Sequence, residues 1–144
     1  MILQIQDDLK KALCFFMQDD SFKELPFARN FPKNSCEIAS AILFLALSDK
    51  YSSAQCTRVK GIDPNTSAIH FWVEVECLVL DPTAHQFPQV AAAFAGVQPQ
   101  FLRNKFSDVL RESKEDVLCA LSEIHVSSTQ AHTVAVKLFE LIRC

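Results

Sequence analysis

A largely apolar segment between residues 38 and 47 constrains the fold of this chain more than any other feature. Its apolar residues cover nearly every side of a helix spanning residues 35–48: Ile38, Ala39, Ala41, Ile42, Leu43, Leu45, Ala46 and Leu47. A helix that is apolar all round is buried in the middle of a domain. The residues at its start are polar. Asn34 is a favourable N-cap, and Glu37 stands three residues later, as in a capping box. The sequence therefore predicts a central helix whose first turn, with Cys36, reaches a surface or a cleft.

The composition agrees with one domain built around this helix. The chain has 144 residues, which is enough for a single domain with a sizeable core. Hydrophobic residues make up 49% and charged residues 22%, as in ordinary soluble globular proteins. The only glycines are Gly61 and Gly96. This number disfavours an all-β fold with many tight turns and a glycine-rich phosphate loop. We expect residues 1–144 to form a single domain.

Helices are also expected at both ends of the chain. Apolar residues recur at helical spacing in residues 2–17, and residues 114–124 and 129–143 have the pattern of two terminal helices. Residues 18–34 are expected to be irregular, because Pro26 and Pro32 limit regular structure. Three phenylalanines of that segment are expected to hold it against the core: Phe22, Phe27 and Phe31.

The middle of the chain is expected to form a small antiparallel sheet with strands at 54–60, 68–75 and 78–81. Residues 84–104 are ambiguous, and an alanine-rich patch at 91–95 fits one or two helical turns. The order of these elements predicts an α+β fold, in which the central helix packs on the sheet and the terminal helices cover the outside.

The hairpin at 68–81 brings two polar side chains to the same face of the sheet. If Glu76 and Cys77 form a two-residue turn, Trp72 faces Asp81 and His70 faces Thr83. His70 and Asp81 are then diagonal neighbours, with Cβ atoms roughly 7–8 Å apart. A carboxylate in that position can accept a hydrogen bond from one imidazole nitrogen and leave the other nitrogen to act as a base. The pattern predicts a His70–Asp81 pair, provided that the turn has an even number of residues.

Cys36 is expected to supply a nucleophile for this pair. A thiol in the first turn of a helix lies near the positive end of the helix dipole and near free N–H groups, and both favour the thiolate. The same N–H groups can bind the oxyanion of a tetrahedral intermediate. Together the three residues would form a thiolate, an imidazole base and an orienting carboxylate.

These motifs resemble a known family. Asn34-Ser35-Cys36 at the start of an apolar helix, then His70-Phe71-Trp72-Val73-Glu74-Val75, then Leu80-Asp81-Pro82-Thr83, is similar to the transglutaminase-like branch of the papain-like cysteine proteases. The ending Ala84-His85-Gln86-Phe87 also resembles small bacterial-type members of this group. The resemblance covers roughly residues 30–87. The chain departs from the family pattern at two places. Asn34 and Ser35 stand where a glycine often precedes the cysteine, and Glu76-Cys77 replaces a glycine-containing turn.

The resemblance implies a cysteine-dependent amide hydrolase or acyl transferase with the triad Cys36, His70 and Asp81. Water as acceptor would give proteolysis or deamidation of glutamine, and an amine would give crosslinking; the small size of the chain favours hydrolysis. The substrate would be a protein or peptide with an amide, and no cofactor is implied. Three further residues are candidates for oxyanion or substrate binding: Asn30, at the offset of a papain-like oxyanion glutamine, Trp72 and Gln86.

Several plainer interpretations stay open. Cys36 alone could be a buried structural thiol, His70 a half-buried strand residue, and Asp81 before Pro82 a turn former. Cys36, His70, Asp81 and His85 are all permitted zinc ligands, although their spacing matches no zinc signature. A non-catalytic member of the same fold that binds a peptide or protein is the alternative function.

Charge and cysteine usage limit the partners and the compartment. The net charge is −3 and no basic block is present, which argues against nucleic-acid binding. Asp7, Asp8, Lys10 and Lys11 interrupt any signal-peptide pattern at the start, and no segment is apolar enough to span a membrane. The six cysteines form no CxxC pair and are expected to be free thiols. We expect a cytoplasmic protein, with secretion by a signal-independent route as the alternative.

Overall fold

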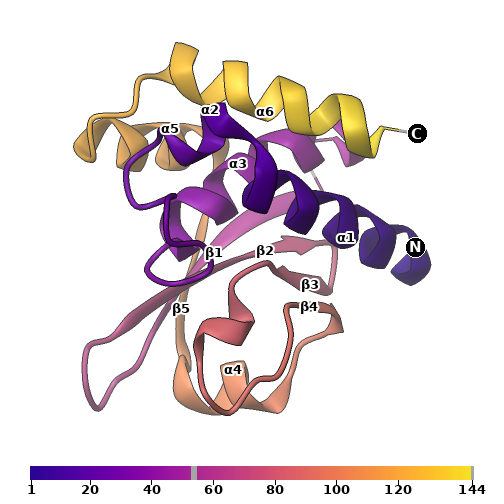
Figure 1. The fold of residues 1–144 in the computed structure, drawn as a ribbon. Coiled ribbons are helices and arrows are strands. Elements are labelled where there is room, and N and C mark those ends of the chain that lie inside the picture. Colours follow the sequence, from indigo (N-terminus) through magenta and orange to yellow (C-terminus); the bar gives the residue numbers. More distant parts are fainter. Residues whose placement is uncertain (53–54, 144) are drawn as a thin grey trace.

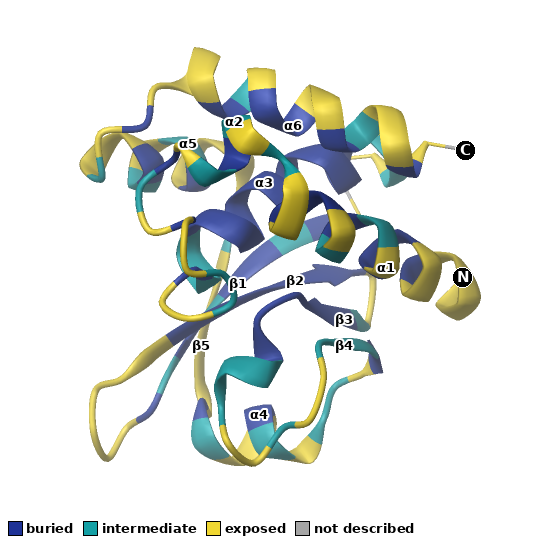
Figure 2. Cartoon of the chain, in the orientation of Figure 1, coloured by how far each residue is buried: buried dark blue, intermediate teal, exposed yellow. Residues whose placement is uncertain are grey.

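The computed structural model describes residues 1–52 and 55–143, and its central element is the helix α3 (Cys36–Tyr51). Every residue from Ile38 to Ser48 is buried in this helix. Figure 1 shows α3 between the helix α6 (Ser128–Ile142) on one side and a sheet on the other, and Figure 2 shows it buried along most of its length. The prediction of a buried central helix is therefore confirmed, with its end three residues beyond the expected one.

The sheet has five antiparallel strands in the order β4-β3-β2-β1-β5. Their bounds are Cys56–Ile62 (β1), Ile69–Val75 (β2), Leu78–Asp81 (β3), Phe94–Val97 (β4) and Asp108–Glu112 (β5). The strands expected at 54–60, 68–75 and 78–81 correspond to β1, β2 and β3, and residue 54 lies outside the described residues. An α+β fold with a small antiparallel sheet is thus confirmed.

Three amphipathic helices lie around α3 and the sheet. They are α1 (Ile2–Gln18), α5 (Lys114–Glu123) and α6, and each lies where the sequence predicts a helix. α5 and α6 contact α3, whereas α1 packs mainly on β4, β3 and α6. The buried stripe of α6 faces α3 and consists of Ala131, Val134, Ala135, Leu138 and Ile142. α5 and α6 both begin with a capping box, from Ser113 and Ser127 respectively. A short helix, α2 (Asp20–Lys23), interrupts the segment that was expected to be irregular.

Two local expectations are wrong. The alanine-rich patch at 91–95 forms no helical turn; it leads into β4, which pairs with the edge of β3, so that tertiary pairing overrides local propensity. The helix of this region lies later, as α4 (Gln100–Lys105). Phe27 does not hold its segment to the core, because its left-handed backbone (φ 65°) directs the side chain outward and leaves it 61% exposed. Phe22 is buried, and Phe31 packs against the core as expected.

The sheet separates two apolar clusters. Val73, Val75 and Leu80 belong to the large cluster that contains α3. The opposite face carries a smaller cluster of Val59, Trp72, Val79, Leu102 and Phe106. This second cluster is closed by the segment after β3, including α4, which lies on the side of the sheet away from α3 (Figure 1).

Candidate active site

The start of α3 differs from the predicted cap. Asn34 has a left-handed backbone (φ 55°), and Ser35 is the N-cap residue, without a side-chain cap hydrogen bond. The Ser35 hydroxyl instead donates to the carbonyl oxygens of Phe27 (2.7 Å) and Lys33 (3.1 Å). The predicted Asn34 cap and its capping box with Glu37 are therefore wrong. The first helical bond runs from the Ala39 N–H to the Ser35 carbonyl. No side chain of the described residues thus caps the N–H groups of the turn that holds Cys36.

The hairpin has the predicted register. Val73 pairs with Leu80 and Val75 with Leu78, so Glu76 and Cys77 form a two-residue turn. Glu76 adopts φ 56° without being glycine. Its N–H donates to the carbonyl of Gln55 (2.7 Å), and its carboxylate accepts from the Gln55 amide (2.8 Å). These contacts from the neighbouring segment stabilise a turn that lacks glycine.

This register brings His70 and Asp81 into direct contact. His70 Nε2 lies 2.7 Å from Asp81 Oδ2, and both side chains are fully buried. The other carboxylate oxygen, Oδ1, accepts the backbone N–H of Thr83 at 3.1 Å and lies 3.4 Å from the Thr83 hydroxyl. Because both oxygens of Asp81 have partners, its carboxylate is fixed in orientation. Asp81 in turn fixes the ring of His70 and leaves Nδ1 for other contacts.

The thiol of Cys36 acts on the same imidazole. Burial by itself lowers the pKa of His70. The carboxylate of Asp81, its hydrogen bond, and a hydrogen bond with Cys36 oppose burial and raise that pKa to about 9. Cys36 itself is half-buried, so solvent reaches the residue that the sequence analysis predicts as a nucleophile. The fold thus brings together Cys36 from α3, His70 from β2 and Asp81 from β3.

Aromatic rings surround the imidazole of His70. The ring centroids of Trp72, Phe87 and Phe106 lie 5.8, 4.9 and 5.4 Å from that of His70. Trp72 is fully buried and its Nε1 lies 3.4 Å from Glu74 Oε2, so this candidate substrate residue is part of the core beside His70. Sequence reasoning missed Phe106, since nothing in the local pattern connects residue 106 to the hairpin.

Gln86 lies on the free side of the imidazole. Its amide Nε2 is 3.4 Å from His70 Nδ1 and 3.2 Å from Thr83 Oγ1. The short helical turn Ala84–Gln86 that follows β3 holds it there. Of the proposed oxyanion donors, Gln86 is the one that the fold places at the ring nitrogen left free by Asp81.

The other two residues considered at sequence level lie elsewhere. Asn30 is exposed and lines a surface hollow beside Lys33, outside the hydrogen bonds described around His70. His85 is half-buried with its ring 6.0 Å from that of Phe31, and burial lowers its pKa despite the carboxylate of Asp81. Within residues 1–52 and 55–143, no group of three or more His, Cys, Asp or Glu side chains is arranged to hold a metal ion. The zinc interpretation therefore finds no ligand set in this part of the chain.

The raised pKa of His70 predicts that stability depends on pH. The folded pKa of about 9 exceeds the unfolded value of 6.5, so the imidazolium stabilises the fold below pH 6.5, and this contribution is lost as pH rises through 9. We expect the free energy of unfolding to fall by about 3 kcal/mol over that interval. Urea denaturation at several pH values measures it. His70→Gln should remove this dependence, and an equal pH dependence in both proteins would contradict the prediction.

The described cysteines, Cys14, Cys36, Cys56, Cys77 and Cys119, are free thiols, and Cys144 lies outside the described residues. No helix in the described ranges is both long and apolar enough to cross a bilayer.

Comparisons of the chain with protein-family models, with curated proteins and with solved structures found no match in any of the three.

Proposed function

We propose that this protein is a cysteine-dependent amide hydrolase or acyl transferase with a papain-like, transglutaminase-like core. Cys36 is the nucleophile, His70 the general base and acid, and Asp81 the orienting carboxylate. The observation that carries the proposal is the fully buried His70–Asp81 hydrogen bond of 2.7 Å, whose imidazole also interacts with the thiol of Cys36. A buried imidazole with a carboxylate at one nitrogen and a partly exposed thiol nearby is the arrangement that a cysteine nucleophile with a histidine base requires.

The chemical steps follow from these contacts. His70 Nδ1 takes the proton of the Cys36 thiol, and the sulfur attacks the carbonyl carbon of an amide. The C–N bond breaks as His70 returns the proton to the leaving nitrogen, which leaves a thioester on Cys36. His70 then removes a proton from water or from an amine, which attacks the thioester and releases the thiol. Asp81 holds Nε2–H throughout and stabilises the imidazolium.

The oxyanion of the intermediate has donors close to Cys36. The first N–H groups of α3 precede the Ala39–Ser35 bond and have no side-chain cap. Helix N-terminal N–H groups are suited to a developing negative charge. The amide Nε2 of Gln86 lies 3.4 Å from His70 Nδ1, the nitrogen that Asp81 leaves free. We assign Gln86 as the side-chain donor to the oxyanion.

Selective alkylation of Cys36 tests the proposal. The protein is treated with iodoacetamide between pH 5.5 and 9, and each cysteine is quantified by peptide mass mapping. We expect Cys36 to react well below pH 8, ahead of the exposed thiols Cys14, Cys77 and Cys119. In His70→Ala, Cys36 should react no faster than the exposed thiols. Candidate protein substrates are then incubated with wild type and with Cys36→Ala, where conversion of glutamine to glutamate indicates deamidation and new termini indicate proteolysis.

One observation favours a second function. The imidazole of His70 is fully buried, and its two nitrogens are already within reach of Asp81 and Gln86. A non-catalytic protein that binds a peptide beside Cys36 has no need of a free nitrogen on the imidazole of His70. Slow and uniform alkylation of all the accessible cysteines in the same experiment would favour the binding protein over the enzyme.

A further inference from the structure

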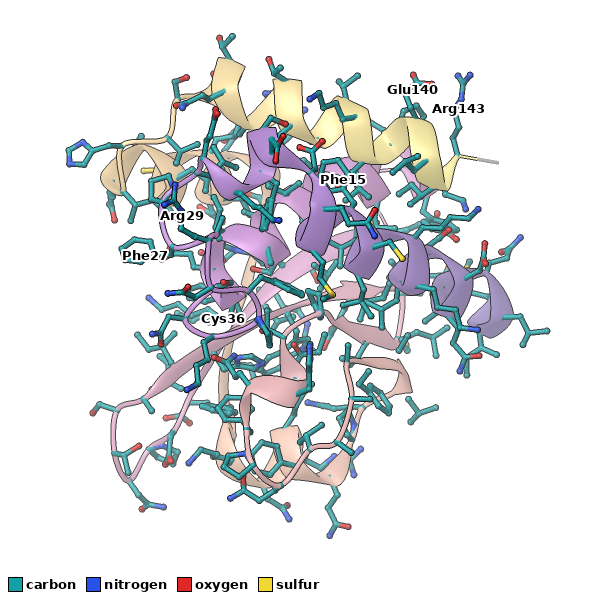
Figure 3. All side chains as sticks on the ribbon, in the orientation of Figure 1. Phe15, Phe27, Arg29, Cys36, Glu140 and Arg143 are labelled. Carbon is teal, nitrogen blue, oxygen red and sulfur yellow. The ribbon has the colours of Figure 1, made fainter. Side chains whose placement is uncertain are left out.

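A hollow of about 360 Å³ lies in the surface formed by the segment that precedes Cys36. Its lining includes Lys23, Phe27, Arg29, Asn30 and Lys33, and we call it the cationic hollow. Figure 3 shows Phe27 and Arg29 on the same side of the molecule as Cys36. Neither the triad nor its oxyanion donors use these residues.

The charges of the cationic hollow are unbalanced. Lys23, Arg29 and Lys33 form no ion pair with any carboxylate of the described residues, although Glu24 also lines the hollow. Seven of the eleven other basic residues pair with a carboxylate, such as Lys50 with Asp8. Three unpaired cations therefore converge on one small hollow in a chain whose net charge is −3. Such a local excess attracts anionic groups.

Backbone hydrogen bonds hold the wall of the cationic hollow in a fixed conformation without a ligand. Successive turns are closed by the N–H of Ala28 to the Leu25 carbonyl (3.2 Å) and by the N–H of Lys33 to the Asn30 carbonyl (2.9 Å). Leu25 and Ala28 are buried beneath it. A preformed site loses less conformational entropy when it binds. The exposed ring of Phe27 adds an apolar surface at its rim.

The cationic hollow is also tied to the start of α3. The hydroxyl of Ser35, next to Cys36, donates to the carbonyl of Phe27 at 2.7 Å. Asn34, which lines the hollow, is two residues before Cys36, so their Cα atoms are at most about 7 Å apart. Residues of an extended peptide are spaced about 3.3 Å apart. A polypeptide with an amide at Cys36 therefore needs only a few further residues to reach the cationic hollow.

We infer that the cationic hollow binds carboxylate side chains of an acidic polypeptide segment and that this segment flanks the amide presented to Cys36. The inference rests on the proposed function and adds the class of substrate. A polypeptide fits better than a nucleic acid, because the cations are confined to one small hollow with an aromatic rim, whereas nucleic acids require a row of phosphate contacts.

Binding of defined peptides tests the inference without any turnover. Fluorescence anisotropy is measured with Cys36→Ala protein and three labelled peptides of equal length. One carries glutamates around a central glutamine, one has glutamine in place of each glutamate, and one has lysine there. We expect clear binding of the acidic peptide alone, weakened by salt. In wild-type protein, the acidic peptide should also protect Cys36 from iodoacetamide. The glutamine peptide should give no such protection.

Charge reversal locates the binding. Arg29→Glu/Lys33→Glu should weaken binding of the acidic peptide about tenfold. Lys10→Glu/Lys114→Glu reverses the same number of exposed cations on α1 and α5 and should leave the affinity unchanged. The milder Arg29→Gln/Lys33→Gln should give an intermediate affinity.

Three results would overturn the inference. They are equal affinity for the acidic and the glutamine peptides, equal weakening by both charge-reversal pairs, and tighter binding of a single-stranded oligonucleotide of matched length. These results differ from failure of the proposed function. An unreactive Cys36 with intact acidic-peptide binding would refute the enzyme alone, and a reactive Cys36 without acidic preference would refute the substrate class alone.

Discussion

Replacement of Asp81 by asparagine is expected to slow alkylation of Cys36 at pH 6 by roughly 10- to 100-fold. In the native protein the carboxylate counters the burial of His70 and raises its pKa to about 9. Asparagine keeps the shape but removes the charge, so burial dominates and the imidazole becomes neutral at pH 6. The thiol of Cys36 then lacks the neighbouring imidazolium that promotes its reaction with iodoacetamide.

The measurement is the second-order rate of iodoacetamide addition at Cys36 between pH 5.5 and 9. Asp63→Asn is the matched control, because Asp63 is also a buried aspartate whose carboxylate accepts a local backbone N–H. Asp63 lies in the β1–β2 turn, away from Asp81 in the chain, and its replacement should leave the Cys36 profile unchanged. A profile for Asp81→Asn that matches wild type would exclude Asp81 from the activation of the thiol.

Replacement of Arg58 by alanine is expected to lower the free energy of unfolding by about 3–5 kcal/mol. The Arg58 side chain is fully buried on β1, and its Nε lies 2.7 Å from Glu112 Oε1 on β5. Its Nη1 donates to the carbonyl of Glu37, next to Cys36, and its guanidinium lies 4.4 Å from the centroid of the Phe71 ring. Alanine removes all of these contacts and leaves the mostly buried carboxylate of Glu112 without its partner.

Chemical denaturation with two comparison variants separates charge from packing. Arg143→Ala breaks an ion pair between two exposed side chains, Arg143 and Glu140, and should cost about 1 kcal/mol or less. Arg58→Met/Glu112→Gln removes both charges and should recover most of the loss. Recovery is expected because Nη2 of Arg58 is buried with no hydrogen-bond partner among the described residues. A loss from Arg58→Ala no larger than that from Arg143→Ala would show that the buried pair has little effect.

The hairpin and the central helix could be predicted from sequence because each depends on a local period. Alternation in residues 68–81 sets which side chains share a face, and a two-residue turn at Glu76-Cys77 then places His70 and Asp81 together. The apolar residues on all sides of the helix at 35–48 required burial between two layers. Both arguments use only side-chain spacing and need no knowledge of the rest of the fold.

The features that escaped prediction depend on distant partners. β5 is exposed along most of its length and has no apolar face that would identify it; its pairing with β1 defines it. β4 likewise exists through pairing with β3. The cap of α3 was misplaced by one residue, because Ser35 binds the carbonyls of Phe27 and Lys33 in place of the helix N–H groups. No rule based on spacing anticipates such competition.

The reactive groups and their enclosure come from different parts of the chain. Cys36, His70 and Asp81 all precede residue 87, but the rings of Phe87 and Phe106 enclose the imidazole, and Leu102 and Phe106 complete the cluster beside it. A segment that ended after the hairpin would keep every reacting atom and expose His70 to water, where its contact with Asp81 is screened. Transfer of the motif to another scaffold would therefore carry the proposed catalytic residues without the surroundings of low dielectric constant that this fold gives them.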